Sequence, residues 1–548
     1  MKGITRYLIY ALLATGLLLA ALLVLTPHSI SRAAPRVLYA APGGVASGNC
    51  NSWANACTLQ YALSLAQSGD EIWVKKGVHY PGPAGDRTAT FALKSGVALY
   101  GGFAGTENSR DARDWQANPT VLSGDIDRND RTDANGVVTT TAHITGTNAY
   151  HVVTAENVDS TAVLDGFIIT AGKADTYPHS SGGGMYIYTS TLTLQNLTFS
   201  GNSASGGGGM YTENGNLTLT NVTFSNNSAN HGSGGGIFNK GGTLTATNVT
   251  FMDNYAFLDG GGIYSYRTAR IVLANGVFFR NSSTSGGGIS NTDQGSMTLI
   301  NVTFSGNSAR WYGGGMRNYF WSRASLTHVI LWNNTASTGP EIYSSETFSP
   351  TIAYSDIRGC GGSGSGWKSE CGTDEGGNID ADPLFVDANA GNLRLQPNSP
   401  AIDAGKEEML PPTLTTDRDG HPRISRGTVD MGAYEYQVTN YHRLSVALAG
   451  SGAGWVHSAP PRIACPDACQ RGFEAGTQVV LTATPGATSR VAGWSGCDSV
   501  AGNTCTLTMN ASRTVTVTFS HTPGVLYAAP TARGQGNCSN WDNRLHRK

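Results

Sequence analysis

The chain has 548 residues, among them 71 glycines, and carries a formal net charge of −2 with only 14% charged residues. Its 39% hydrophobic content argues against disorder, and glycine without a strict three-residue period excludes collagen. No basic run occurs before the last few residues, so we expect no nucleic-acid partner. What remains is a β-rich, turn-dense protein with room for two or more domains.

The N-terminus, residues 1–34, predicts a signal peptide or an N-terminal anchor. Lys2 and Arg6 precede an apolar run over residues 8–25, and a small-residue site follows at 31–33. A helix needs about 20 apolar residues to cross a bilayer, so cleaved signal and uncleaved anchor both stay open. We therefore expect a secreted protein, or one held at the cell surface or outer membrane, that meets a membrane only through this segment if it is uncleaved.

Nine cysteines are present, and eight of them fall into close pairs, which in an exported protein favours local disulfides over zinc. Exchange between the last two pairs stays open, and Cys538 has no partner. The expected pairs are Cys50 with Cys57, Cys360 with Cys371, Cys465 with Cys469, and Cys497 with Cys505.

Residues 37–160 predict the cap of a solenoid. A small cysteine loop encloses Trp53, and residues 58–67 have the apolar spacing of an amphipathic helix with Thr58 as its N-cap. Short glycine-punctuated strands follow, which suits a segment that covers the exposed core and strand edges at the end of a solenoid.

Residues 164–340 contain a repeat with a period of 25 to 27 residues, which indicates a solenoid, propeller or array. Each copy has a glycine triplet, a strand-like run, and a phenylalanine followed three residues later by asparagine. The triplets begin at Gly182, Gly207, Gly234, Gly260, Gly286 and Gly313; the second halves are Phe199/Asn202, Phe224/Asn227, Phe251/Asn254, Phe278/Asn281, Phe304/Asn307 and the degenerate Leu331/Asn334.

Alternation along each strand decides which side chains face the core. In residues 221–224, Val222 and Phe224 should point inward, so stacked copies would place the phenylalanines in one internal column. The asparagines after them should line a turn, tolerate a left-handed backbone and bond to the next copy's main chain. The period is too short for propeller blades and the leucine columns of a horseshoe are absent, so we predict an all-β, right-handed parallel β-helix.

The repeat, glycine-glycine-x-Ile with Phe-x-x-Asn, resembles that of the polymorphic outer-membrane protein family, whose passengers are β-helices displayed on bacterial surfaces. Residues 382–405, with the motifs DRDGHPR and VDMGAYEY, resemble the closing segment of choice-of-anchor Q surface proteins. Together these resemblances extend the expected β-helix over residues 37–436, with a closing segment at 341–436. Residues 444–520 alternate strictly and resemble divergent internalin-type B repeats, which implies a small all-β stalk module.

Residues 525–548 begin a second internal repeat. Residues 525–543 match residues 37–55 at a constant offset, and Cys538 stands where Cys50 stands, but the match stops after Asn543. We interpret this as the truncated start of a second β-helix unit.

A polysaccharide lyase or hydrolase would need carboxylates, or calcium ligands with a Lys or Arg base, on equivalent positions of adjacent repeats. The charged residues of the repeats occupy different phases and are predicted not to converge: Glu213, Asp253, Asp259, Asp293, Lys240, Arg267, Arg270, Arg280 and Arg310. We therefore favour a non-enzymatic protein with no cofactor and leave the enzyme open as the alternative.

Two further groups are candidate sites. The acid-rich group Asp374, Glu375, Asp380, Asp382 and Asp387 is a candidate for structural calcium or a polar turn region, and Asp417, Asp419 and Asp430 have the same two interpretations. The residue after each triplet's Met or Ile forms an aromatic column, Tyr186, Tyr211, Phe238 and Tyr264, which should face outward. Exposed stacked aromatics suit sugar rings or a partner protein, although they also stabilise β-helices without a ligand. The expected function is adhesion, glycan or partner binding, or envelope structure, with a polysaccharide or a host or neighbouring cell as partner.

The truncated repeat gives the first testable prediction. Sequencing the genomic DNA downstream of the stop codon should show a continuing β-helix repeat, in this frame or another. Downstream DNA without any such repeat would contradict the interpretation.

Overall fold

The structure is a computed structural model that describes residues 36–345, 348–425, 428–437, 440–466 and 468–521, and the backbone of two short strands near the C-terminus, β44 (Ala528–Ala529) and β45 (Leu545–His546). The predicted signal segment and most of the predicted second unit lie outside the described residues. Among the described residues, no helix is long and apolar enough to cross a membrane.

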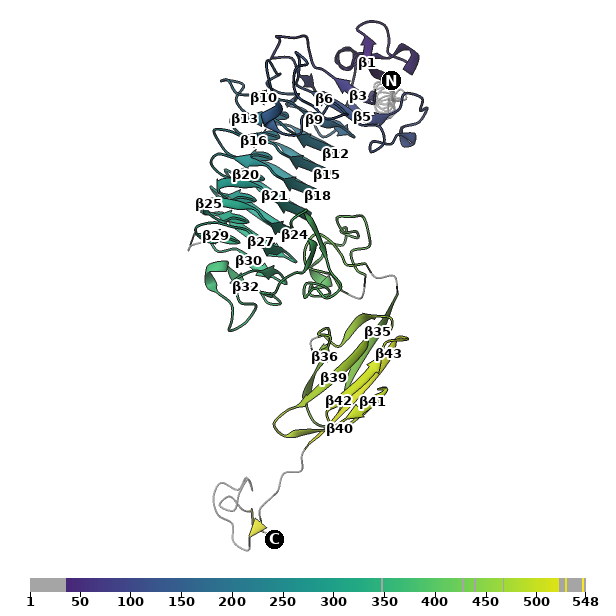
Figure 1. The fold of residues 1–548 in the computed structure, drawn as a ribbon, viewed down its shortest axis with the longest axis vertical. Coiled ribbons are helices and arrows are strands. Elements are labelled where there is room, and N and C mark those ends of the chain that lie inside the picture. The colour runs from purple at the N-terminus through teal and green to yellow at the C-terminus, as the bar shows by residue number, and fades with distance from the viewer. Residues whose placement is uncertain are drawn as a thin grey trace, which may run out of the picture.

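The described residues up to about 380 form a right-handed parallel β-helix of about 11 turns (Figure 1). Three parallel sheets run along it. We call them sheets A, B and C and give their strands in chain order.

Sheet A, the largest, comprises β1 (Val37–Val45), β2 (Glu71–Lys75), β3 (Gly77–His79), β5 (Ala98–Phe103), β6 (Thr120–Ser123), β8 (Val163–Asp165), β9 (Ile168–Thr170), β12 (Thr191–Ser200), β15 (Asn216–Ser225), β18 (Thr243–Met252), β21 (Arg270–Phe279), β24 (Ser296–Ser305), β27 (Arg323–Thr327), β28 (Ile330–Trp332), β30 (Thr351–Ala353), β31 (Asp356–Ile357) and β32 (Thr373–Asp374).

Sheet B comprises β4 (Phe91–Ala92), β7 (Val153–Glu156), β11 (Met185–Tyr188), β14 (Met210–Glu213), β17 (Ile237–Lys240), β20 (Ile263–Tyr266), β23 (Ile289–Asn291), β26 (Met316–Asn318) and β29 (Ile342–Ser344). Sheet C comprises β10 (Lys173–Ala174), β13 (Ser203–Ala204), β16 (Ser228–Ala229), β19 (Tyr255–Ala256), β22 (Ser282–Ser285) and β25 (Ser308–Tyr312).

The predicted cap begins the solenoid. The helix α2 (Leu59–Leu65) starts at Thr58, whose side chain accepts a hydrogen bond from the Tyr61 amide, and it buries Leu59, Ala62 and Leu63 against the core. Strands of sheet A already run through this region, so the cap is also part of the solenoid. Short 3-10 turns complete the set of helices: η1 (Trp53–Asn55), η2 (Arg110–Ala112), η3 (Thr141–His143), η4 (Ser369–Cys371) and η5 (Glu407–Met409).

The phenylalanine column is confirmed. Neighbouring rings from Phe199 to Phe304 stack 4.6 to 4.9 Å apart and almost parallel, and each is at most 1% exposed. The third glycine of each triplet is needed because this column lies against it. A Cβ on Gly209, for example, would lie 2.9 Å from the ring of Phe224 and 2.7 Å from the Gly236 carbonyl.

The asparagines three residues after the phenylalanines form a buried ladder, which we call the inner ladder: Asn202, Asn227, Asn254, Asn281, Asn307 and Asn334. The Asn227 backbone amide and Nδ2 both donate to Oδ1 of Asn254, and Nδ2 of Asn227 also donates to the Phe199 carbonyl. The side chain therefore bonds the main chain of the preceding turn and the side chain of the next one, whereas the prediction placed the main-chain bond on the next turn. The predicted left-handed backbone falls instead on the preceding residue, such as Asn226, Asp253 or Arg280.

A second set of asparagines bends each long strand of sheet A. Asn196, Asn221, Asn248 and Asn275 have positive φ, and each Nδ2 donates to the residue one turn earlier; Asp165 accepts from Asn196 at the start. We call this the outer ladder. Beyond Asn275, the Nδ2 of Asn301 donates to the carbonyls of Asp430 and Gly432, so the closing segment continues the pattern.

The predicted closing segment contains two parts. Strands β29 to β32 still belong to the solenoid, and the chain then leaves it and packs along the side of sheet A, with the antiparallel pair β33 (Phe385–Asp387) and β34 (Asn392–Leu395). A separate apolar cluster seals this contact and includes Val277, Phe279, Ile330, Phe385 and Met431.

The predicted C-terminal module is confirmed as two sheets around one core that includes Leu444, Val479 and Phe519. One sheet has the order β38 (Gln470–Glu474), β35 (Tyr441–Gly450), β43 (Arg513–His521), β40 (Ser489–Ser495); the other has β37 (Ala464–Cys465), β36 (Gly454–Ala459), β39 (Gln478–Pro485), β42 (Thr504–Thr508), β41 (Ser499–Ala501).

The eight paired cysteines form the four predicted local disulfides. In the solenoid, Cys50 is bonded to Cys57 and Cys360 is bonded to Cys371. In the module, Cys465 is bonded to Cys469 and Cys497 is bonded to Cys505, so the exchange that the sequence left open between these two pairs does not occur. The ninth cysteine, Cys538, lies outside the described residues.

The inner ladder gives a stability prediction. Asn254→Ala should lower the free energy of unfolding by about 3 kcal/mol, since it leaves two buried donors of Asn227 without their acceptor, each at a cost of about 1–3 kcal/mol, and removes one bond to the Phe224 carbonyl. Denaturant unfolding of the full chain measures it. The matched control is Asn216→Ala, which removes an exposed asparagine of β15. Equal midpoints for the two variants would contradict the role given to the ladder.

Candidate functional site

The predicted aromatic column lies on the outer side of sheet B. Tyr186, Tyr211, Phe238 and Tyr264 are paired in register from β11 to β20. They face outward because Met185, Met210, Ile237 and Ile263, the residues before them, point into the core. The same register continues through Ser290 and Arg317 to Tyr343.

The rings form one continuous stack. Tyr186 and Tyr211 lie 5.5 Å apart and nearly parallel, and Phe238 meets Tyr211 and Tyr264 edge-on at 5.1 and 4.9 Å. This packing covers more of the column than the sequence suggested. Tyr211 is only 8% exposed, so the expectation of an exposed ring is wrong there, while Tyr186, Phe238 and Tyr264 are half-buried. The column offers ring edges and partly covered faces.

Histidines extend the stack at its N-terminal end. His151 lies 5.2 Å from the Tyr186 ring, and its Nε2 is 3.3 Å from Nδ1 of His179, whose ring stacks on Tyr150 at 4.9 Å. Arg87 lies over the Tyr150 ring, 4.1 Å from its centre. Burial lowers the pKa of His151 to about 4, so this residue is uncharged at neutral pH. Sequence reasoning missed this end of the stack because both histidines lie before the first glycine triplet at Gly182 and follow none of the repeat's spacing.

Two ion pairs stand beside the column. Glu213 and Lys240 occupy the same register position and lie 2.8 Å apart, and the Tyr211 hydroxyl donates to Glu213. Asp259 and Arg317 are 2.7 Å apart across two turns. These pairs were not predicted from the sequence; in each, a single carboxylate of the repeats meets a cation one or two turns away, as Asp253 also meets Arg280.

Each of these pairs joins a carboxylate to a cation, and the cation affects the pKa of the carboxyl group. Burial disfavours the charged form of Glu213, but hydrogen bonds from Lys240 and Tyr211 outweigh it and lower the pKa of the carboxyl. Burial raises the pKa of Asp259, and Arg317 offsets part of that shift. A hydrolase needs two carboxyl groups across one bond. On this face Glu213 and Asp259 each have a cation as their partner instead.

The acid-rich group at 374–387 does not come together as one site. Asp374 accepts from Ser363, Gly364, Gly376 and Asn378; burial disfavours its charge, but these bonds outweigh burial and lower its pKa to about 2. The other acids mostly bond amides of nearby turns: Asp380 accepts from Gly359 and Gly361, Asp382 from Leu384, and Asp387 from Ala390. This arrangement favours the polar-turn interpretation over calcium.

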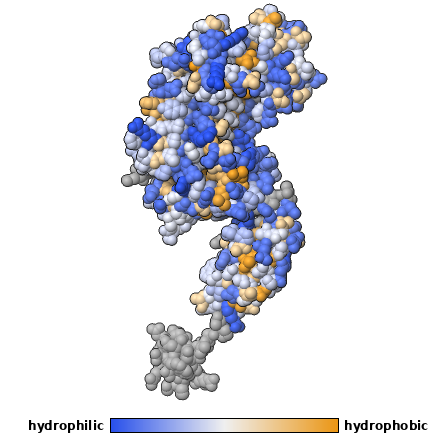
Figure 2. Space-filling view, viewed as in Figure 1, coloured by the Kyte–Doolittle hydropathy of each residue, from blue (hydrophilic) through white to orange (hydrophobic). Residues whose placement is uncertain are grey.

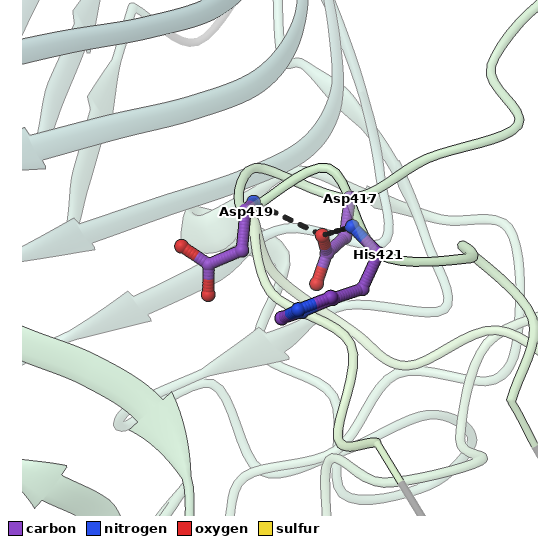
Figure 3. A group of neighbouring side chains, drawn as sticks. All are labelled: Asp417, Asp419 and His421. Atoms are coloured by element: carbon purple, nitrogen blue, oxygen red, sulfur yellow. Dashed lines mark hydrogen bonds between the residues drawn. The ribbon is translucent and has the colours of Figure 1, made fainter. Parts of the chain in front are cut away.

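One group in the described residues has metal-ligand spacing: ligand atoms of Asp417, Asp419 and His421 lie within 4.8 Å of one another (Figure 3). Asp417 is fully buried, and its carboxylate accepts from the amides of Asp419, His421 and Glu435. Asp419 is held by the Arg394 guanidinium through two bonds of 2.6 and 2.7 Å. A cation would have to displace this arginine, so the group fits a loop-closing turn better than a metal centre.

The remaining charges of the closing segment also hold backbone. Arg423, 1% exposed, donates to the carbonyls of Asp430, Gly432 and Ala433, and lies 3.7 Å from Glu435. Asp430 in turn accepts from the amides of Asp403 and Tyr436. Burial raises the pKa of Asp430 and Glu435, and Arg423 works against that shift. Arg423, Asp430 and Glu435 therefore form a buried framework within the closing segment.

Two further buried carboxyl groups were not found from the sequence. Glu341 replaces the third glycine of a degenerate triplet, and its carboxyl accepts from the Asn334 amide and Nδ2, which ends the inner ladder. Asp356 points outward from β31 but is covered by the closing segment, and its Oδ2 has no partner among the described residues. The signal for Glu341 was present: residues 339–342 read as a seventh copy of the triplet.

Comparisons agree with this architecture. The family model described as "right handed beta helix region" matches residues 143–336. The solenoid is a right-handed parallel β-helix. A second family model, "divergent InlB B-repeat domain", matches residues 466–523 and confirms the predicted identity of the module.

Three solved structures resemble the chain at low identity. The pectate lyase Pel9A is 14% identical with a TM-score of 0.47, covering 74% of this chain and 97% of that one. A rhamnogalacturonan lyase is 12% identical with a TM-score of 0.32, covering 64% of this chain and 91% of that one. A polygalacturonase from Erwinia carotovora ssp. carotovora is 13% identical with a TM-score of 0.24, covering 63% of this chain and 96% of that one. At these values the likeness concerns the β-helix alone. No curated protein matches the sequence.

The buried carboxyls predict a pH dependence of stability. Burial raises the pKa of Glu341 from 4.5 to about 7 and that of Asp356 from 3.8 to about 8. A carboxyl with a higher pKa in the folded state binds more protons there, so its contribution is complete below its ordinary pKa and is lost as the pH rises through the folded value. The unfolding temperature should therefore fall between pH 5 and pH 8.

Asp356→Asn together with Glu341→Gln should reduce this fall, because the amides keep the shape and carry no titrating proton. Thermal unfolding followed by circular dichroism at both pH values measures it, with the exposed Asp387→Asn as control. An undiminished fall in the double variant would show that other groups cause the pH dependence.

Proposed function

We propose that this protein is an exported, non-catalytic surface protein whose β-helix binds a polysaccharide or a partner molecule along the outer face of sheet B. The observation that carries the proposal is the unbroken stack from His179 and Tyr150 through Tyr186 to Tyr264. Partly exposed aromatic rings on a rigid sheet bind sugars and apolar side chains without a large loss of conformational entropy. Adhesion or envelope structure are the roles that such binding would serve.

The groups beside the stack support binding over catalysis. Glu213 and Asp259 are each paired with a cation. Ion pairs of this kind give a face defined polarity and fixed side chains. That combination orients a ligand without acting on its bonds.

Export is supported by independent features. Four disulfides form in the described residues, which requires an oxidising compartment. The N-terminal sequence has the pattern of a signal or an anchor. The resemblances to polymorphic outer-membrane proteins and to choice-of-anchor Q proteins extend the same proposal to display at the cell surface or outer membrane, with the B-repeat module as a stalk.

A carbohydrate-active enzyme is the alternative. The observation that favours it is the presence of Lys240 and the exposed Arg267 next to the aromatic column, since lyases use Lys or Arg as a base. Under this alternative the face of sheet B would cleave an acidic polysaccharide.

Binding can be tested on a glycan array with the full chain. We expect binding by the wild type and about a tenfold or greater loss for Tyr186→Ala/Tyr264→Ala, because both half-buried tyrosine rings of the column are removed. The matched control is Tyr255→Ala, which removes a 43% exposed tyrosine of sheet C outside the column. Equal binding by wild type and double variant would remove the proposal.

The enzyme alternative has its own readout. The wild type is incubated with uronic-acid polymers, and the absorbance of unsaturated ends is followed. We expect no increase in absorbance. A steady increase that disappears in Lys240→Met would establish the lyase in place of the binding protein.

A further inference from the structure

One loop of the solenoid, between β26 and β27, differs in residue type from the equivalent loops of the preceding coils. Between β26 and β27 the chain passes through Tyr319, Phe320 and Trp321, which are 37%, 50% and 57% exposed. Phe320 and Trp321 have φ of 51° and 62°, two consecutive residues in the left-handed region. We call this the Phe-Trp turn.

The equivalent loops of the three preceding coils have the same backbone conformation but other residue types. The three preceding turns have the same pair of left-handed residues, at Gly241–Gly242, Arg267–Thr268 and Asp293–Gln294. Consecutive left-handed residues favour Asn and Gly, and other residues lose about 1–2 kcal/mol each in this region. Placing two bulky aromatics there therefore costs stability and exposes apolar surface. Neither folding nor stacking explains that choice.

The turn is nevertheless rigid. The Gln294 amide donates to the Phe320 carbonyl, and the Asn318 Nδ2 donates to the Ser322 carbonyl. Ser322 is fully buried and its hydroxyl accepts from the Gly295 amide. The Phe320 and Trp321 rings stack at 5.4 Å and are nearly parallel. The backbone of the turn is thus held by hydrogen bonds, and the two stacked rings stand exposed on it.

Two adjoining hollows lie beside the turn on the outer face of sheet A, with volumes of about 360 and 660 Å³, and both are lined by Ser296, Arg323 and Phe348. Trp321 lines the smaller one. The floor of the larger is a column of hydroxyl groups in register, Thr298, Ser325, Thr351 and Thr373. In Figure 2 the surface of the β-helix is mostly hydrophilic, with apolar residues in small separate areas.

Arg323 is the one charged residue among those that line the hollows, and no ion pair to it occurs among the described residues. Guanidinium groups bind carboxylate and sulfate oxygens through paired hydrogen bonds. A tryptophan face takes the apolar side of a sugar ring, and hydroxyl groups spaced one turn apart, about 4.8 Å, can bond successive residues of a chain. The described residues that line the hollows include no carboxylate that could repel an acidic ligand.

We propose that the Phe-Trp turn and the hydroxyl column form a second binding site, for a glycan chain that carries an acidic group. Trp321 stacks on a sugar ring, Arg323 binds its carboxylate or sulfate, and the chain lies across the turns toward Thr373. The site is on sheet A, so it is separate from the aromatic column of sheet B.

Calorimetry on the full chain tests the site with two acidic probes, a sulfated heparin-derived tetrasaccharide and tetragalacturonate, and with uncharged cellotetraose. We expect binding of at least one acidic probe, weaker at high salt, and weak binding of the neutral one. Arg323→Gln should reduce acidic binding about tenfold and remove the preference for the acidic probe. Trp311→Ala, 48% exposed in β25 and outside the hollows, is the matched control and should bind normally.

The decisive variant is Phe320→Asn/Trp321→Gly, which places Asn and Gly, the residues favoured at two consecutive left-handed positions, in the turn. It should raise the unfolding temperature and lose binding, a combination that a purely structural role would not produce. No binding of either acidic probe by the wild type, or unchanged binding in this variant, would overturn the proposal.

Binding to anionic phospholipid vesicles that depends on the same pair, without glycan binding, would assign the turn to a membrane instead. Loss of binding only in Tyr186→Ala/Tyr264→Ala would support the sheet B face and overturn this site.

Discussion

The inner asparagine ladder is the interaction on which the rest of the structure depends. A parallel β-helix stacks turns that differ in sequence and length, so something must fix which residue lies above which. Each ladder asparagine binds the next turn twice through its own amides, and binds the preceding turn's main chain once. These bonds are fully buried, where an unmade hydrogen bond is costly. A slip of one residue would break all of them, and the register of the phenylalanines and of both outer faces follows from this constraint.

The positions of the charged residues follow from the same register. Charges on the turns of sheet B meet an opposite charge on a neighbouring turn, as Glu213 meets Lys240. The buried charges of the closing segment, with Arg423 at the centre, hold its own backbone together. What is left for a partner includes aromatic rings on sheet B, and hydroxyl groups with Arg323 on sheet A.

Much of the fold could be predicted because the spacing between copies of a repeat shows which residues lie above one another in a solenoid. The spacing of Phe199 and Phe224 predicts the core column, and the close cysteine pairs, such as Cys50 with Cys57, predict the disulfides. The sites were harder to predict, for physical reasons. Contacts between turns join residues 25 to 58 positions apart, as in Asp259 and Arg317, and no local pattern shows them. Burial of Asp356 depends on a segment that folds back from beyond the solenoid. The exposure of Tyr211 depends on how neighbouring rings pack, which alternation alone does not specify.

The two ladders run in opposite directions. Amides of the inner ladder donate toward the C-terminus and end on Glu341, whereas amides of the outer ladder donate toward the N-terminus and end on Asp165. At one end of each ladder the last asparagine has no further asparagine to accept its hydrogen bond, and an acidic side chain accepts it instead. Between these two acids the turns from Asn196 to Asn281 each supply one asparagine to each ladder, so an added turn that carries both asparagines would continue both ladders and keep both closing bonds.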